Sequence, residues 1–376
     1  MFHRKKIIFV INNFAIGGVE KLLFDIISRL DKQKFTISII TVLGSGPLEA
    51  QFRGLNIPIY FAAGKSSFYA KQWFYKALWL AVSPVVLVRL VWWLGCFRPE
   101  VVVTSLYQSD ILGMLASWLV STPKRVLIHH DTYPVGRSRA WLKQKIGVGL
   151  ATKIVAVSQT VKDFVINYFG APADRVVVIP NGIDTNRFSN SGKSPDCANL
   201  VLGMVGRLEP VKGPLIFVQA LQILQTKFGL TPPSYLGGEG SLKPDLMNYA
   251  AEAQLHSLTM DGEIKDVPAW LKKIDILVNP SLSEGFSLVI LEGLAANKLM
   301  VVSDLPSTRE LITDGDNGCW FPVGDAAALA DILYRLLTDQ ASFRHIEQNV
   351  MRWQQQRLSR YDIRRVAESY EQLLLA

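Results

Sequence analysis

Short, nearly continuous runs of apolar residues recur along the chain and predict strands. Six such runs, rich in β-branched residues, occupy the first half: IIFVI (7–11), TISIITVL (36–43), EVVVTS (100–105), RVLIHH (125–130), KIVAVS (153–158) and RVVVIP (175–180). The second half repeats the pattern in LVLGMVG (200–206), IDILVNPS (274–281) and KLMVVSD (298–304). Apolar runs without polar alternation are typical of parallel strands that are covered on both faces.

Segments of helical composition separate these runs, and alternating strands and helices indicate a doubly wound α/β sheet. A chain of 376 residues exceeds what a single core usually supports, so we expect two such Rossmann-like domains in tandem. The polar segment SNSGKSPDCAN (189–199) marks the linker region between them. We therefore expect a first domain over 1–185, a second over 186–360, and a final helix over 361–376 that crosses back to the first domain.

The net charge of +8 is unevenly distributed. Residues 1–180 contain 22 Lys and Arg against 9 Asp and Glu, whereas the remainder contains 18 against 23. The first half therefore carries +13 and the second −5, which favours an anionic partner for the first half. A nucleic acid is not expected, because no nucleic-acid-binding signature accompanies the charge. An anionic membrane surface or an acidic substrate remains, beside the alternative of a basic surface that is simply solvated.

Two further features indicate the compartment. The three cysteines (Cys96, Cys197 and Cys319) are scattered and form neither a disulfide framework nor a zinc motif, which favours a reducing, cytoplasmic location. The N-terminus MFHRKKIIFVINN begins like a signal peptide, but its apolar run is short and no cleavage site follows. We interpret it as the first strand.

The segment ALWLAVSPVVLVRLVWWLGCF (77–97) is almost long enough to span a membrane. Pro84 is expected to break its first part and Arg89 interrupts it, so a spanning helix is not expected. Aromatic and cationic residues alternate in and before it, as is typical of a helix lying in a lipid headgroup layer: Lys71, Trp73, Phe74, Tyr75, Lys76, Trp79, Arg89, Trp92 and Trp93. The alternative is a buried helix that covers the sheet.

Two acidic residues stand in the otherwise apolar stretch SEGFSLVILEGLA (283–295). Glu284 falls in the turn after a predicted strand, and Glu292 lies about one turn inside the next predicted helix. Ligands of such sheets bind where strands end and helices begin, and a helix N-terminus attracts anions. Two carboxylates beside an anion site suit a molecule with phosphates and hydroxyls, such as a sugar nucleotide. Alternatively, they are a turn residue and a helix-surface acid.

A second motif, VLGMVGRLEPVKG (201–213), leads from a predicted strand into a turn that contains Arg207 and Lys212. A guanidinium fork and a mobile ammonium group together suit a diphosphate. Taken alone, such a pair could equally belong to an ordinary surface.

Together with VVIPNGIDTNRF and AIGGVEKLLFDI, these motifs make the chain resemble glycosyltransferase family 4 along nearly its whole length. The resemblance implies a GT-B fold, in which two Rossmann-like domains face each other across a cleft. It also implies sugar transfer from a nucleotide-diphosphate donor with retention of anomeric configuration. We expect metal-independent transfer with no cofactor besides the donor substrate.

The resemblance also implies roles for individual residues. Arg207 and Lys212 would stabilise the departing diphosphate, Glu284 would contact the transferred sugar, and Glu292 the ribose. The remaining donor-site positions are the backbone of Phe286, Ser287 and Leu288, the loop glycines Gly17 and Gly18 with Glu20 behind them, and His130. The neighbouring His129 is expected to be a packing residue.

The sequence therefore predicts a retaining glycosyltransferase that is peripheral on the inner face of the cell membrane. Its acceptor would be a polysaccharide or lipid-linked glycan of the bacterial surface. A glucan synthase acting on soluble polymer, or a non-catalytic subunit that binds sugar nucleotides, are the alternatives.

Overall fold

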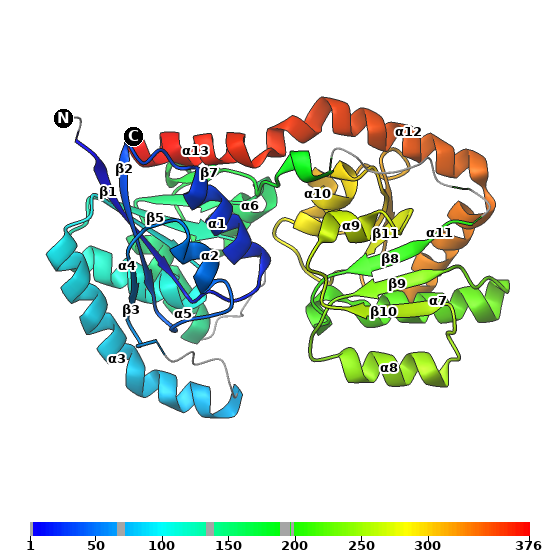
Figure 1. The fold of residues 1–376 in the computed structure, drawn as a ribbon, viewed down its shortest axis with the longest axis horizontal. Helices are drawn as coiled ribbons and strands as arrows, with labels where there is room; N and C mark the ends of the chain where they lie inside the picture. The colour runs from blue at the N-terminus through cyan, green and yellow to red at the C-terminus, as the bar shows by residue number, and fades with distance from the viewer. Residues whose placement is uncertain (1–2, 66–71, 133–138, 189–195, 197–198) are drawn as a thin grey trace. The chain divides into compact units, whose positions relative to one another are not determined.

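The computed structural model describes residues 3–65, 72–132, 139–188, 196 and 199–376, with the backbone alone for 72–82, 139, 140 and 143 (Figure 1). The chain divides into two compact units. The first comprises Met1–Asn181 together with Ile363–Ala376, and the second comprises Gly182–Asp362.

The first unit is built on a seven-stranded parallel sheet in the order β3-β2-β1-β4-β5-β6-β7. Its strands are β1 (Lys5–Ile11), β2 (Phe35–Thr41), β3 (Ile59–Phe61), β4 (Val101–Ser105), β5 (Lys124–His129), β6 (Lys153–Ala156) and β7 (Val176–Val178). The central strands β1 and β4 are buried almost throughout, as their uninterrupted apolar sequences predict.

Helices separate the strands of this sheet and cover its faces (Figure 1). They are α1 (Gly18–Arg29), α2 (Glu49–Arg53), α3 (Gln72–Phe97), α4 (Tyr107–Leu119), α5 (Arg139–Leu150), α6 (Gln159–Phe169) and the 3-10 turn η1 (Ala173–Arg175). The unit is completed by α13 (Ile363–Leu375), which packs against α1. Lys34, which directly precedes β2, and Glu371 of α13 form an ion pair of 2.6 Å.

The helix α3 corrects one expectation, because it continues through Pro84. A proline inside a helix removes one backbone hydrogen bond, but packing can compensate for that loss. Val86, Leu90 and Leu94 recur every fourth residue, are completely buried and join the core cluster of β1 and α4. This half of α3 is therefore anchored in the unit.

The described side chains of α3 form a packed face and an exposed face. Trp93 packs on Tyr60 of β3, with ring centroids 5.5 Å apart, and Arg89 donates a hydrogen bond of 3.0 Å to the carbonyl of Ala62. Trp92 remains exposed. The expected side chains of Trp73, Phe74, Tyr75, Lys76 and Trp79, and the whole of Lys71, lie outside the described residues. Among the residues that are described, no helix is both long and apolar enough to cross a bilayer.

The second unit contains a six-stranded parallel sheet in the order β10-β9-β8-β11-β12-β13. Its strands are β8 (Leu202–Val205), β9 (Ser234–Gly237), β10 (Leu258–Gly262), β11 (Ile276–Asn279), β12 (Leu299–Ser303) and β13 (Cys319–Phe321). The direction in which the chain adds strands reverses between β8 and β11. In parallel sheets the carboxyl ends of the strands at this reversal are the usual ligand site.

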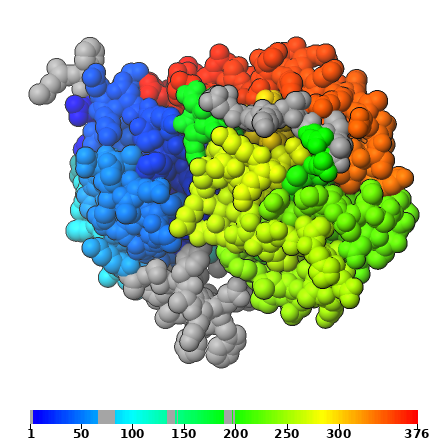
Figure 2. Space-filling view, turned by 45° about the vertical axis from the view of Figure 1, so that its right-hand side comes forward, coloured from blue at the N-terminus to red at the C-terminus, as the bar shows by residue number. Residues whose placement is uncertain are grey.

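The helices of the second unit lie between and after these strands. They are α7 (Pro214–Phe228), α8 (Lys243–Glu252), α9 (Val267–Leu271), α10 (Leu288–Ala295), α11 (Ala326–Thr338) and α12 (Gln340–Arg357), with 3-10 turns η2 (Thr185–Phe188), η3 (Pro210–Lys212), η4 (Thr308–Glu310) and η5 (Leu358–Tyr361). In Figure 2, α11 and α12 form the orange part of this unit's surface. The elements that position the candidate site are β8, η3, β11 and α10.

Candidate functional site

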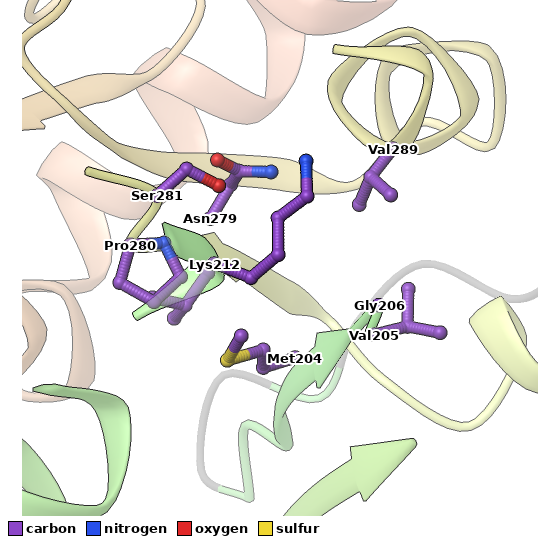
Figure 3. A pocket seen from close by; sticks show the side chains of 9 residues that line it. Met204, Val205, Gly206, Lys212, Asn279, Pro280, Ser281 and Val289 are labelled. Carbon is purple, nitrogen blue, oxygen red and sulfur yellow. The ribbon is translucent and has the colours of Figure 1, made fainter. Parts of the chain in front are cut away.

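A small pocket lies where β8 and β11 end, at the reversal of strand order in the second unit (Figure 3). It is lined by Met204, Val205, Gly206, Lys212, Val278, Asn279, Pro280, Ser281 and Val289. Lys212 is the one charged residue of this lining. The pocket therefore offers a positive charge and, at Gly206, backbone without a side chain, which suits an anionic ligand that approaches the backbone closely.

Lys212 is held at the pocket by Glu284, the first of the two predicted acids. Its Nζ lies 2.6 Å from Oε1 of Glu284, and the hydroxyl of Ser281 donates to the same oxygen at 2.8 Å. The Glu284 side chain is only 8% exposed and that of Lys212 is 26% exposed. A buried carboxylate is costly unless it is paired and hydrogen-bonded, and both conditions are met here. The two motifs thus meet in one charged pair.

The loop that carries Lys212 can approach β11 because it contains a glycine. Gly213 has a φ of +64°, and a Cβ atom added there would lie 2.1 Å from the carbonyl oxygen of Pro280. The amide of Leu282 donates to the carbonyl of Val211 at 2.8 Å, which ties the two loops together. A glycine is therefore required at position 213 for two reasons. Residues with a side chain rarely adopt a positive φ, and a Cβ atom would clash with the Pro280 carbonyl.

The N-terminus of α10 borders the same pocket through Val289. Ser287 is its N-cap, and its Oγ accepts hydrogen bonds from the amide of Ile290 at 3.4 Å and from Nδ2 of Asn279 at 3.2 Å. The Phe286 side chain is buried and its ring lies 5.8 Å from that of Tyr361. Leu288 is the first helical residue. The predicted turn thus places a helix N-terminus, with its positive dipole end, next to Lys212.

Arg207 and Glu292 are among the predicted donor-site residues that do not line this pocket. Arg207 is exposed and, in the described part of the chain, has no ion-pair partner. It lies near Glu209, whose pKa is lowered mainly by hydrogen bonds from Ser241. Glu292 is half-buried on α10, outside the lining. Their predicted roles remain predictions.

In the first unit, the predicted glycine loop leads directly into α1. Gly17 is the N-cap and Gly18 the first residue of that helix. A Cβ atom at Gly17 would lie 2.3 Å from a carboxylate oxygen of Glu20, which is buried in the first turn. The glycine therefore leaves room for an acid that interacts favourably with the helix dipole.

The two predicted histidines occupy different environments. His129 is buried between Phe164 and Phe169, with ring centroids 6.1 and 5.7 Å away. The Nε2 of His130 lies 2.8 Å from Oγ of Ser105, at the end of β4. Burial, and secondarily the neighbouring His129, lowers the pKa of His130 to about 3. His130 is therefore a neutral imidazole near pH 7 and can act as a hydrogen-bonding group rather than as a cation.

The sequence interpretation did not name three further polar residues. Asn279 is the last residue of β11 and Ser281 follows that strand, and both line the pocket. Asp110 lies in the first turn of α4, where burial raises its carboxyl pKa well above the usual value. Polar residues at the carboxyl end of a predicted strand, as in NPS (279–281), were the available signal. In the part of the chain that is described, no three His, Cys, Asp or Glu side chains gather as metal ligands.

Comparisons with known proteins identify both units. The family model "Glycosyltransferase Family 4" matches residues 16–187, and "Glycosyl transferases group 1" matches residues 199–339. An Escherichia coli relative, UDP-Gal:alpha-D-GlcNAc-diphosphoundecaprenol alpha-1,3-galactosyltransferase, is 28% identical over 261 residues, which cover 64% of this chain and 67% of the relative. The capsular polysaccharide biosynthesis glycosyltransferase CapM of Staphylococcus aureus is 23% identical over 269 residues, covering 65% and 69%. Matches to two D-inositol 3-phosphate glycosyltransferases span 56% and 64% of those relatives' own length.

Solved structures agree with the observed fold. HepE of Anabaena, whose structure contains UDP, superposes with a TM-score of 0.78 over 98% of this chain and 99% of its own, at 21% identity. The two parallel-sheet units with seven and six strands are those of a GT-B fold. The chain therefore belongs to the family 4 glycosyltransferases, and the predicted family and fold are confirmed.

Proposed function

We propose that this glycosyltransferase transfers a sugar from a nucleotide-diphosphate donor with retention of anomeric configuration and without a metal ion. The observation that carries the proposal is the Lys212–Glu284 pair beside the N-terminus of α10, at the strand-order reversal of the second unit. Lys212 and the helix dipole supply positive potential for a diphosphate. Glu284 supplies an acceptor for sugar hydroxyls.

In this proposal the catalytic effect is electrostatic. The bond between the anomeric carbon and the diphosphate breaks while the acceptor hydroxyl attacks the same face of the sugar, and the departing phosphate oxygen takes up the hydroxyl proton. Lys212 would share its ammonium group between Glu284 and the phosphate as negative charge develops there. Arg207, on the same loop and exposed, could supply a second positive charge. Neutral His130 of the first unit would hydrogen-bond to the donor sugar.

We further propose that the acceptor is a polysaccharide or lipid-linked glycan, and that the protein works on the inner face of the cell membrane. The E. coli and S. aureus relatives are named for a diphosphoundecaprenol-linked acceptor and for capsular polysaccharide biosynthesis, respectively. The basic first half and the exposed apolar face of α3 support contact with anionic lipid.

The donor is tested by measuring the release of nucleotide from UDP-, GDP- and ADP-sugars, with diphosphoundecaprenol-linked sugars and soluble glucans as alternative acceptors. We expect one donor to be used and release to be stimulated by the lipid-linked acceptor. Proton NMR of the product reports whether the anomeric configuration is retained, and activity in excess EDTA tests the absence of a metal requirement. A chain that neither hydrolyses nor transfers any of these donors would contradict the proposal.

A further inference from the structure

Phe286 is the one apolar side chain of the turn 284–287, which carries Glu284 and leads into α10. It is buried, with 7% of the residue exposed. It stands between Glu284, which pairs with Lys212, and Ser287, the N-cap of α10. The burial of Phe286 is therefore the hydrophobic contribution that holds this turn in place.

The ring of Phe286 contacts that of Tyr361, the last residue of η5. Their ring centroids lie 5.8 Å apart and their planes are inclined by 39°. Tyr361 also stacks on Trp353 of α12, with centroids 6.0 Å apart and an angle of 11°. Burial, and secondarily the carboxylate of Glu310, raises the pKa of the Tyr361 phenol. A neutral ring between two aromatic neighbours acts on the turn by packing rather than by charge.

The backbone at Tyr361 is held where the chain enters and leaves the second unit, Gly182–Asp362. The amide of Ile183 donates a hydrogen bond of 2.9 Å to the carbonyl of Tyr361. Ile183 also forms a parallel bridge with Asp362, and the Asp362 carboxylate accepts a hydrogen bond from the hydroxyl of Thr185. Tyr361 is therefore fixed by contacts with a segment that is distant in the sequence.

The helix α10 is attached to the same elements at both of its ends. It packs against α12 and η2, and Nε2 of Gln354 on α12 donates to the carbonyl of Ala295, its last residue, at 2.6 Å (Figure 1). At its other end, the contact between Phe286 and Tyr361 holds the turn that precedes it. This is the end that borders the pocket through Val289.

We propose that Tyr361 is a positioning residue for sugar transfer, whose ring acts through Phe286 to hold Glu284 in the geometry that the reaction requires. The proposal rests on the proposed function, because it takes Glu284 to contact the donor sugar. Tyr361 does not line the pocket and lies outside the motifs on which the family resemblance depends. Its effect therefore reaches the ligand through the turn.

The test compares variants of the full-length chain in the nucleotide-release assay with UDP-, GDP- and ADP-sugars. Tyr361→Ala removes the ring, and we expect kcat to fall by about 10- to 100-fold, because small displacements of orienting groups have effects of this size. Calorimetric titration with UDP, GDP and ADP should show a Kd that rises by less than about threefold, since a nucleoside diphosphate lacks the sugar that Glu284 contacts. Tyr361→Phe loses only the hydroxyl, so kcat should stay within about twofold of the wild type.

The matched control is Tyr334→Ala, the same substitution at a second aromatic stack of this unit. Tyr334 of α11 stacks on Phe228 with ring centroids 4.1 Å apart. Phe228 is the last residue of α7, at the end of that helix remote from Lys212. This variant should keep the kcat of the wild type.

A double variant tests whether the effect passes through Phe286. Phe286→Leu should lower kcat, and adding Tyr361→Ala should lower it little further, because both substitutions break the same contact. If the two fold-losses multiply instead, the residues act independently and the inference is overturned.

Circular dichroism shows whether each variant is folded at the assay temperature, and Tyr361→Leu replaces Tyr361→Ala in every comparison if the alanine variant is not. A purely structural role predicts a lower Tm with an unchanged kcat below it, and that result would overturn the inference. So would a Tyr361→Phe variant that is as slow as Tyr361→Ala. Both results would leave the proposed function standing, whereas a wild-type chain that uses none of the sugar nucleotides would overturn the proposed function and this inference together.

Discussion

Lys212 gives the pocket its positive charge, and Glu284 is the partner of that charge before any ligand binds. We expect Lys212→Ala to lower the rate constant for sugar transfer by about 10²- to 10³-fold, as for the loss of one preorganised charge or donor at a developing anion. The variant should also lose about 1–3 kcal/mol of stability, because the buried carboxylate of Glu284 loses its counter-ion. Transfer assays and urea unfolding measure the two effects.

An exposed ion pair serves as the control that separates the loss of activity from the loss of stability. Lys227 and Asp331 are also an ion pair, at 2.8 Å, but both side chains are 56% exposed. Lys227→Ala should change stability by less than about 1 kcal/mol and leave transfer unaffected. The double variant Lys212→Ala/Glu284→Gln should recover stability without recovering activity, since neither charge remains unpaired. Transfer within about threefold of wild type in Lys212→Ala would contradict the assigned role.

His130 predicts a specific dependence of stability on pH. Its pKa in the folded chain is about 3, lowered by burial and then by His129, against about 6.5 when unfolded. Below pH 6.5 the unfolded chain therefore takes up a proton that the folded chain does not. The stabilising contribution is fully present above that pH and is lost as the pH falls, by up to about 1.4 kcal/mol per pH unit.

Urea unfolding at pH 7.5, 6.5 and 5.5 measures this dependence. His130→Asn cannot titrate but can still hydrogen-bond to Ser105, so its stability should fall less steeply with decreasing pH than that of the wild type. Part of the slope should remain, because burial also lowers the pKa of His129. Equal slopes in both proteins would show that folding does not lower the pKa of His130.

At the same scale, the sequence predicted Lys212 and Glu284 as candidate residues but did not predict that they contact each other. The spacing of Glu284 and Lys212 in two separate motifs led to both, but their direct pairing depends on Gly213 bringing one loop against the other. Asn279 was predicted as part of a strand, because a single polar residue after the apolar run ILV (276–278) has no spacing pattern of its own. Its place in the pocket lining becomes visible only in the structure.

At the scale of elements, the strands with continuous buried apolar sequences follow from the sequence, and the others do not. β1, β4 and β8 have continuous apolar sequences, whereas β3, β9, β10 and β13 each contain residues that are not fully buried and were not predicted. These four strands lie toward the edges of the two sheets, where neighbouring strands and covering helices stabilise them more than their own composition does. Packing against the core likewise stabilises α3 on both sides of Pro84.

The exposed side of α3 makes the lipid proposal testable. Val85, Val88 and Trp92 are 50%, 68% and 63% exposed, opposite the buried face of Val86, Leu90 and Leu94. If this side enters the headgroup layer, Val88→Ser together with Trp92→Ser should reduce flotation with anionic vesicles severalfold, because about 25 cal/mol is lost for each Å² of apolar surface no longer buried. Met247→Ser on α8, 54% exposed in the second unit, is the control and should float as the wild type does. Wild-type protein that stays in solution with anionic vesicles at low salt would remove the lipid proposal and leave the chemistry unaffected.

At the scale of the whole molecule, the C-terminal helix belongs structurally to the first unit. Five residues of α13 are buried there: Ile363, Val366, Ala367, Tyr370 and Leu374. We expect Tyr370→Ala to destabilise the first unit by about 3–5 kcal/mol, as for truncation of a large buried aromatic side chain. Because two-unit chains need not unfold in one step, the loss should appear in one of two unfolding transitions. A variant whose transitions both match the wild type would contradict this packing.

This division of the chain also predicts which half can act alone. Every residue that lines the pocket lies between 204 and 289, and the entire second sheet lies within Gly182–Asp362. A fragment of residues 182–362 should therefore fold and bind the nucleoside diphosphate that the full chain prefers, but it should not transfer sugar, since His130 and the Gly17–Gly18 loop are absent.

The fragment 1–181, by contrast, lacks α13 and leaves apolar surface of α1 uncovered, so it should be less stable than the same fragment with residues 363–376 attached through a flexible linker. Circular dichroism and calorimetric titration distinguish the fragments, and a folded 182–362 that binds no nucleotide would show that nucleotide binding also requires the first unit.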